Sequence, residues 1–204
     1  IKSELASSVP GLPQAEPSLK ITYVQPKDFT GLLRYVRNIL VVTIDPTAYT
    51  KVSVGYENNV WARGQVVVSL KAPNTESIVE YSKTHEKALV NFFVKVEMNR
   101  AIEQLQKEYS MVVMDNLKSD LNVMLNAPAN FTYYKDTTDF FWSSNNANTG
   151  RMDLIVYTFP YTDPNTFTEE YLVAKRDSVL KANLPGSFPN SYMKTEKRFE
   201  LSYE

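Results

Sequence analysis

One stretch of the sequence, residues 75–109, constrains the fold more than any other. Its apolar residues recur at mostly helical spacings, and Asn74 before it is a good N-cap. The stripe consists of Ile78, Tyr81, His85, Leu89, Phe92, Val96, Ile102, Leu105 and Tyr109. It predicts one continuous helix, about 50 Å long, with Leu89, Phe92, Val96 and Leu105 buried. A helix of this length needs a sheet beneath much of its stripe.

The segments around this helix are typical of strands and shorter helices. Alternating or branched apolar runs predict strands at 19–23, 39–44 (buried), 61–70, 121–125, 140–142, 152–159 and 191–204. Caps and helical spacing predict helices at 29–36, 111–119 and 166–182, whereas 46–60 is a polar excursion. We therefore predict an α+β fold, with an antiparallel or mixed sheet and helices packed mainly on one face.

The domain organisation has two interpretations. The 204 residues suit a single α+β unit, part of a longer precursor, with a sizeable core. A weak internal repeat instead favours two similar lobes, 1–109 and 110–204. Each half contains a tryptophan, a predicted strand, the tripeptide Pro-Asn-Thr and a predicted helix, in that order. The repeated residues are Trp61, Pro73–Thr75, Trp142 and Pro164–Thr166. Chance accounts for the repeat equally well, since Pro-Asn-Thr suits any helix start.

Composition excludes several classes of function. The chain has no cysteine, hence no disulfide, thiol nucleophile or Cys-ligated metal, and His85 is its single histidine. We interpret His85 as a hydrogen-bonded, partly buried structural residue, and the scattered carboxylates, among them Asp120 and Asp136, as solvated surface groups. A formal charge of −1 gives no reason to bind nucleic acid. No apolar run approaches the ~20 residues of a membrane helix, and we predict no metal and no cofactor.

The sharpest enzyme hypothesis is a serine acyltransferase of the penicillin-binding class. Ser178–Lys181 matches S-x-x-K, Ser143–Asn145 matches S-x-N, and Lys194–Glu196 nearly matches K-T-G. However, the S-x-N element precedes the serine instead of following it, and Glu196 replaces the glycine. Ser178 also falls inside a predicted helix and not at its start. We therefore predict that the protein is not an enzyme and has no catalytic residue.

The aromatic side chains are the best candidates for a binding site. The chain has 13 Tyr, 10 Phe and 2 Trp, and several of them lie at predicted loops and strand ends. Exposed rings stack on sugars or receive a protein partner, and the competing interpretation is that these rings fill the core of a sheet. The candidate ligand-binding residues are Trp61, Trp142, Tyr56 and Tyr161.

Several longer stretches of the sequence carry a family resemblance. They are Val9–Gln14, Asn38–Tyr49, Trp61–Val68, Phe92–Arg100, Phe141–Asn146, Val156–Tyr161 and Lys175–Ser178. In these stretches the chain resembles a family of Bacteroidetes lipoproteins known only as a domain of unknown function. The resemblance implies a secreted precursor with a lipid anchor near its N-terminus, and therefore a place in the cell envelope, in the periplasm or at the outer membrane.

The resemblance implies no activity, since none is established for the family. We expect a non-catalytic envelope protein that binds another protein or has a structural role. The alternative is a module that binds glycan or another small ligand through loop aromatics. Expected partners are an envelope protein or a glycan, not nucleic acid, with membrane contact only through the precursor's anchor. The strand pattern of residues 191–204 also predicts pairing with a neighbouring strand, within the chain or in a homodimer.

Overall fold

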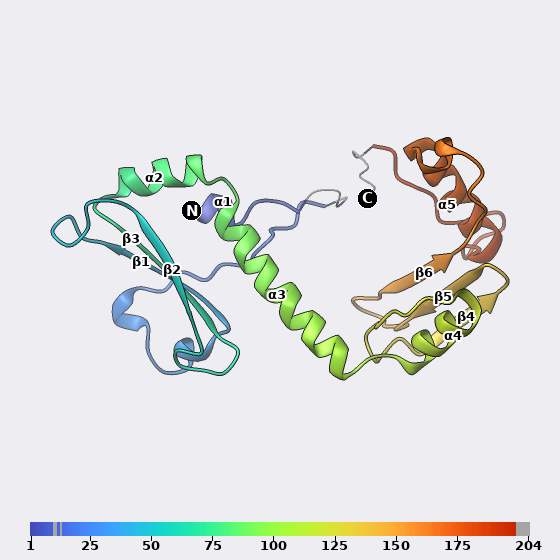
Figure 1. The fold of residues 1–204 in the computed structure, drawn as a ribbon, viewed down its shortest axis with the longest axis horizontal. Coiled ribbons are helices and arrows are strands. Elements are labelled where there is room, and N and C mark those ends of the chain that lie inside the picture. The colour runs from blue at the N-terminus through green and yellow to red at the C-terminus, as the bar shows by residue number, and fades with distance from the viewer. Residues whose placement is uncertain (10–11, 13, 199–204) are drawn as a thin grey trace. The chain divides into compact units, whose positions relative to one another are not determined.

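The computed structural model of the protein describes residues 1–9, 12 and 14–198. Its helices and two small three-stranded sheets form an α+β fold arranged in two lobes, which confirms the predicted class (Figure 1). The chain divides into two compact units, unit 1 with residues 1–98 and unit 2 with residues 99–204. Each unit buries its own cluster of apolar side chains.

The sheet of unit 1 is mixed and has the strand order β1-β3-β2. Its strands are β1 (Asn38–Ile44), β2 (Ser53–Asn58) and β3 (Val66–Ala72). β1 runs parallel to β3, and β2 runs antiparallel to it. The branched run of β3 therefore lies at the centre of the sheet, where Val68, Leu70 and Ala72 are buried.

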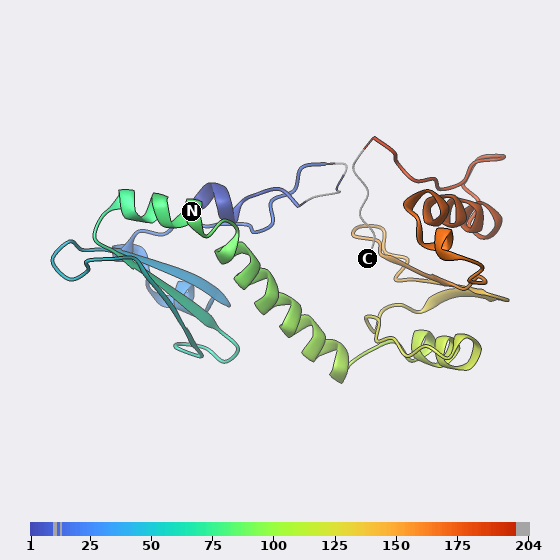
Figure 2. The same cartoon turned by 45° about the horizontal axis from the view of Figure 1, so that its top comes forward.

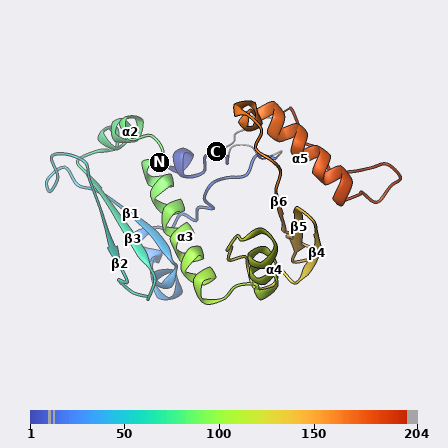
Figure 3. The same cartoon turned by 45° about the vertical axis from the view of Figure 1, so that its right-hand side comes forward.

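Helices cover the face of this sheet that carries Val68 and Leu70 (Figure 2, Figure 3). They are α1 (Lys2–Leu5), α2 (Thr75–Thr84) and the first half of α3 (Ala88–Lys107). Their contributions to the core are Leu5, Ile78, Leu89, Val90 and Phe93. Asn74 caps α2 as predicted, because its side chain accepts a hydrogen bond from the Ser77 N–H at 2.8 Å.

The prediction of one continuous helix over 75–109 is wrong, because α2 and α3 are separate. α2 ends at Thr84, α3 begins at Ala88, and Lys87 between them has a left-handed φ of 62°. The His85 ring stacks on Tyr81 with centroids 4.1 Å apart, and its Nδ1 lies 3.1 Å from the Tyr81 carbonyl oxygen. His85 is hydrogen-bonded as predicted but is exposed, which the prediction of partial burial missed.

The buried face of α3 also differs from the predicted stripe. Leu89 is buried as predicted, but Phe93, 3% exposed, occupies the core position predicted for Phe92. Phe92 is half-buried, as are Val96 and Leu105. The break at 85–87 explains the change, because three residues outside helical geometry shift the phase of the stripe from one helix to the next.

The helix predicted at 29–36 forms only as a short 3₁₀ helix, and the side chain of a buried glutamine, Gln65, binds the carbonyls at its end. Two short 3₁₀ helices flank and occupy this region, η1 (Pro26–Asp28) and η2 (Gly31–Tyr35). The Gln65 side chain, 1% exposed, donates from Nε2 to the carbonyls of Arg34 at 2.6 Å and Val36 at 2.7 Å. Its Oε1 accepts from the Trp61 N–H at 3.0 Å. Val36 has an extended backbone, and its carbonyl accepts a hydrogen bond from the Gln65 side chain in place of a backbone N–H of a helix.

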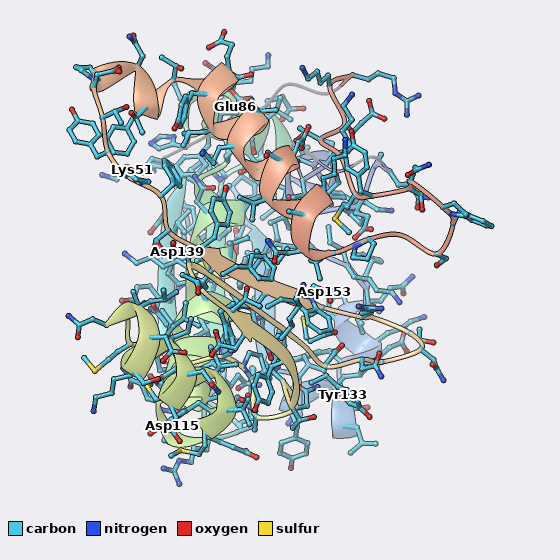
Figure 4. The ribbon with its side chains drawn as sticks, turned by 90° about the vertical axis from the view of Figure 1, so that its right-hand side faces the viewer. Lys51, Glu86, Asp115, Tyr133, Asp139 and Asp153 are labelled. Carbon is cyan, nitrogen blue, oxygen red and sulfur yellow. The ribbon has the colours of Figure 1, made fainter. Side chains whose placement is uncertain are left out.

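Unit 2 is an antiparallel sheet, in the order β4-β5-β6, between two helices. Its elements are α4 (Met111–Leu121), β4 (Tyr133–Thr137), β5 (Phe140–Ser144), β6 (Asp153–Tyr157), η3 (Pro164–Phe167) and α5 (Glu169–Asn183). α4 packs through Val113 and Leu117 on the face that carries Phe141. α5 lies on the opposite face of the sheet (Figure 4). The Lys135 Nζ of β4 donates a hydrogen bond to the carbonyl of Asn183 at the end of α5, at 2.7 Å.

The strands predicted at 19–23 and 121–125 are not formed. Residues 19–23 are irregular. At 121–125, α4 continues to Leu121 and Asn122 ends it in the left-handed conformation, with φ 53°. Of the strand predicted at 191–204, residues 191–198 form only a bridge between Tyr192 and Pro185, and residues 199–204 lie outside the described residues.

Other predicted elements are confirmed with shifted boundaries. β1, β5, β6, α4 and α5 lie where the sequence predicts them, while the strand predicted at 61–70 begins only at Val66. The cap of α5 is Thr168, and the capping box belongs to η3, between Asp163 and Thr166. In the described part of the chain, no helix combines the length and the apolar character needed to cross a membrane.

Candidate functional site

Between Leu40 and Ile44, the outer edge of β1 presents backbone groups that form no backbone hydrogen bond with another described residue. On the inner side, the Arg37 carbonyl accepts from Val66 N–H at 2.8 Å, and Asp45 N–H donates to the Ala72 carbonyl at 2.9 Å. Backbone groups point alternately to the two sides along a strand, so those of Leu40, Val42 and Ile44 point away from β3. No described residue forms a backbone bond with these three residues on that side.

This edge is apolar and carries no charge. Val41, Val42 and Ile44 are 36%, 44% and 48% exposed, so the strand is predicted correctly but its burial is not. The reason is topological, because β3 occupies the centre of the sheet and β1 its border. Sheet edges are usually protected by charged residues, proline or a bulge, and the sequence of β1, Asn38–Ile44, contains neither charge nor proline.

Two of the four predicted ligand-binding aromatics, Trp61 and Tyr56, lie in unit 1, and the other two, Trp142 and Tyr161, lie in unit 2. In unit 1, Trp61 is 38% exposed and meets Phe29 edge-on, with ring centroids 5.5 Å apart. Tyr56, 60% exposed, leans on Phe92 with centroids 5.0 Å apart. Each of these rings covers another ring of the same unit, and so each has a packing role.

In unit 2, Trp142 is half-buried and fixed in place. Its Nε1 donates to Asp153 Oδ1 at 3.0 Å, and the Arg151 guanidinium, bound to the same carboxylate, lies 6.0 Å from the Trp142 ring centroid. Tyr161 is different, because it is 62% exposed and stacks on Phe167, itself 61% exposed, with centroids 5.3 Å apart. This pair is a flat aromatic surface of the kind that the sequence predicts for sugar binding.

The residues of the acyltransferase hypothesis have structural positions. Ser178 is exposed in the middle of α5, as predicted, and not at a helix start. Ser143 and Ser144 are buried in β5, where their hydroxyls donate to the carbonyls of Tyr133 at 2.9 Å and Met152 at 3.1 Å. These hydroxyls are engaged in holding the sheet together.

Two carboxylates, Asp120 on α4 and Asp136 on β4, approach each other. Burial raises the pKa of Asp136, and the neighbouring Asp120 raises it further. The hydrogen bond from Ser119, 2.5 Å long, lowers the pKa of Asp120. The described residues contain no group of three or more His, Cys, Asp or Glu placed to hold a metal ion. An acidic pair of this kind does not by itself define a binding site.

The segment that follows α5 is attached to it by hydrogen bonds centred on Asp177 and Thr195. Thr195, 6% exposed, donates to Asp177 Oδ1 from its N–H at 2.9 Å and from its hydroxyl at 2.6 Å, and Arg176 donates to the same hydroxyl oxygen. Burial raises the pKa of Asp177, but the bonds from Thr195 and the charge of Arg176 outweigh it, so its pKa lies below the ordinary value of 3.8.

We expect this attachment to weaken in acid. A carboxyl whose pKa is depressed in the folded state stabilises it above the unfolded pKa, and the contribution disappears as the pH falls through the folded value. The Asp177→Asn variant should therefore be less stable than the wild type at pH 6, with the difference shrinking towards pH 3. Urea denaturation at the two pH values measures this, with Asp115→Asn, on the exposed side of α4, as the control. A difference that is equal at both pH values contradicts the assignment.

The fold and this edge define a two-unit α+β protein with an unprotected strand at the border of its first sheet. Residues 1–106 match the model of a family described as a domain of unknown function, DUF8532, and the chain belongs to this family. Residues 110–204 match a second domain of unknown function, DUF4837. The predicted resemblance to a domain of unknown function is thereby confirmed. No curated protein and no solved structure matches the chain.

Proposed function

We propose that this chain is a non-catalytic protein of the bacterial envelope that binds another protein through the free edge of β1. The occupant is an extended, uncharged segment of a partner, which adds one strand to the sheet of unit 1. The observation that carries the proposal is the exposed apolar edge formed by Val41, Val42 and Ile44, with outward backbone groups that lack partners among the described residues.

The chemistry of this edge favours strand addition. An added strand gains main-chain hydrogen bonds from the outward groups of Leu40, Val42 and Ile44 and covers their side chains. The opposite edge is less suited, because β2 carries the charge of Glu57 and the flexible backbone of Gly55. An uncharged edge selects an uncharged partner segment, since a charged side chain placed beside it would lose solvation without gaining a counterion.

The proposed location rests on the sequence resemblance. We propose that the precursor is a Bacteroidetes lipoprotein, attached to the membrane through a lipid on a cysteine and exposed to the periplasm or at the outer membrane. In that setting the β1 edge faces other envelope proteins at high local concentration, and no membrane-spanning segment of its own is needed.

Site-specific photo-crosslinking tests the β1 edge. A photoreactive phenylalanine analogue is placed at Val42 in the full-length protein in its own envelope, and at Val54 in a matched control. Both valines are partly exposed, at 44% and 38%, and both lie opposite Leu70, on the two edges of one sheet. We expect a discrete adduct with another protein from position 42 and none from position 54.

Other outcomes would overturn the assignment. Equal adducts from both positions would mean nonspecific contact, and no adduct from position 42 would mean that the edge stays free. An adduct that contains only a second copy of this chain would replace the proposed partner by a symmetric pairing of two β1 strands, as in a homodimer. Mass spectrometry of the adduct distinguishes these results.

The second candidate function is glycan or small-ligand binding, and it is favoured by the exposed stack of Tyr161 and Phe167. Sugar rings stack on such surfaces. It ranks below strand addition because the other predicted residues, Trp61, Trp142 and Tyr56, pack against neighbours in their own units.

A further inference from the structure

Two pairs of aromatic rings in unit 2 connect the segment after β6 to η3 and α5. In the inner pair, Phe159 and Tyr171 are half-buried and have ring centroids 5.9 Å apart. The ammonium group of Lys175 lies over both rings, 5.5 Å from the centroid of Phe159 and 5.7 Å from that of Tyr171. Unit 2 therefore already contains one pair of rings that holds a cation through their electron-rich faces.

The outer pair consists of Tyr161 and Phe167, whose ring centroids are 5.3 Å apart. Tyr161 follows Phe159 by two residues and Phe167 precedes Tyr171 by four, so the outer pair is next to the inner pair along both segments. Its rings are 62% and 61% exposed, and among the described residues no lysine or arginine lies over either of them. The outer pair thus has the rings of the inner pair without a cation from the described chain.

The charged residues along this part of the chain are all acidic. Residues 158–174, which contain all four rings, include Asp163, Glu169 and Glu170 and no lysine, arginine or histidine. Asp163 and Glu170 are exposed and Glu169 is half-buried. A cation placed over the outer pair is attracted both by the ring faces and by these carboxylates, whereas an anion is repelled.

We propose that the outer pair receives an arginine side chain of a protein partner. The guanidinium group of arginine is planar, stacks on aromatic faces and pairs with carboxylates through several N–H groups. It lies over the rings of Tyr161 and Phe167, as the Lys175 ammonium lies over the inner pair, and its charge is balanced by the acidic residues of the segment. A surface of two open rings favours arginine over a compact ammonium ion, which is more strongly hydrated.

This site is independent of the proposed strand addition, because the outer pair belongs to unit 2 and the β1 edge to unit 1. Either assignment can fail without the other. Glycan stacking, the second candidate function, would use the same two rings, so the test has to distinguish an arginine from a sugar. The difference between them is charge, since a sugar ring stacks on the pair without any gain from the carboxylates.

An NMR titration of the full chain with three probes makes this distinction. The first probe is the peptide acetyl-Ser-Arg-Ser-Arg-Ser-amide, and the second has citrulline, the uncharged analogue of arginine, at both arginine positions. The third is methyl β-glucoside. We expect the arginine peptide to bind at millimolar concentration and the citrulline peptide to bind about threefold or more weakly. Added salt should weaken only the arginine peptide.

Variants connect the binding to the residues. Tyr161→Ala should lower the affinity for the arginine peptide about threefold or more. Tyr134→Ala, which removes another tyrosine of unit 2 that is 52% exposed, should leave it unchanged. Replacing Glu169 and Glu170 together by glutamine should weaken the arginine peptide but not the citrulline peptide. Phe167→Ala is the second test of the rings if Tyr161→Ala does not fold.

Four results would overturn the proposal. The first is no binding of the arginine peptide at millimolar concentration, and the second is equal binding of the arginine and citrulline peptides. The third is a folded Tyr161→Ala or Phe167→Ala variant that binds the arginine peptide as the wild type does. The fourth is a glucoside that binds more tightly than the arginine peptide and loses its binding in Tyr161→Ala, which would assign the outer pair to glycan stacking.

Discussion

Replacing Phe93 by alanine should lower the free energy of unfolding of unit 1 by about 3–5 kcal/mol, as for other large aromatic side chains removed from a core. Phe93 is 3% exposed and packs in the cluster that joins α3 to β3. Each unit has a single tryptophan, so Trp61 fluorescence in a Trp142→Phe background follows unit 1 during urea denaturation.

The neighbouring Phe92→Ala variant is the matched control. Phe92 is half-buried and contacts Tyr56 and Phe93, so its removal leaves a space that solvent reaches, and we expect a smaller loss. Equal losses for the two variants, or a larger loss for Phe92→Ala, would show that the helix presents the face predicted from the continuous stripe.

Phe141→Ala should destabilise unit 2 by a similar amount, about 3–5 kcal/mol. Phe141 is 1% exposed at the centre of β5, and it packs in the cluster of Val113 and Leu117, both at 0%. The surrounding side chains fill the cavity poorly, because they belong to a helix and a sheet that hold them in place. Denaturation followed by Trp142 fluorescence in a Trp61→Phe background measures the loss.

Tyr134→Ala serves as the control in this unit. The Tyr134 ring stacks over Phe141 with centroids 6.3 Å apart, but the residue is 52% exposed. We expect its removal to cost about 1 kcal/mol or less, the usual range for a surface position. If both variants cost the same, the cluster around Phe141 is not the core of unit 2.

The elements predicted correctly are those whose local signals agree with their tertiary environment. Apolar β5 and β6, α4, and the Asn74 cap of α2 belong to this group. The prediction of one long helix is wrong because the apolar stripe does not reveal the left-handed backbone of Lys87, which divides the helix. Because the helical period was extended across that break, it predicts Phe92 as the buried residue in place of Phe93.

Of the two missed strands, β4 has no apolar alternation, whereas β2 has Val54 and Tyr56 alternating with polar residues, a short signal that the prediction of a polar excursion at 46–60 missed. Every residue of β2 is exposed, and the strand exists because it pairs along the length of β3. β4, with the sequence Tyr133–Thr137, likewise pairs with β5 and is mostly exposed. The formation of β2 and β4 depends on a partner strand elsewhere in the chain, which is information that local propensity does not contain.

The candidate sites were even less predictable. The sequence predicts β1 as a buried strand, since an apolar run does not tell whether its strand lies at the centre or at the edge of a sheet. The aromatic candidates were chosen by residue type, and type does not distinguish the exposed Tyr161 from the fixed Trp142.

The strand order of unit 1 has a consequence during synthesis on the ribosome. β3 is the partner of both β1 and β2, yet it is the last of the three to leave the exit tunnel. Until then the apolar run of β1 has no strand to pair with. Its partner residues in β3 begin at Val66, so pairing requires the intervening segment to form a loop. The nascent chain thus carries an exposed apolar segment that a chaperone is suited to shield, and the completion of β3 covers one edge of β1 while leaving the other edge open.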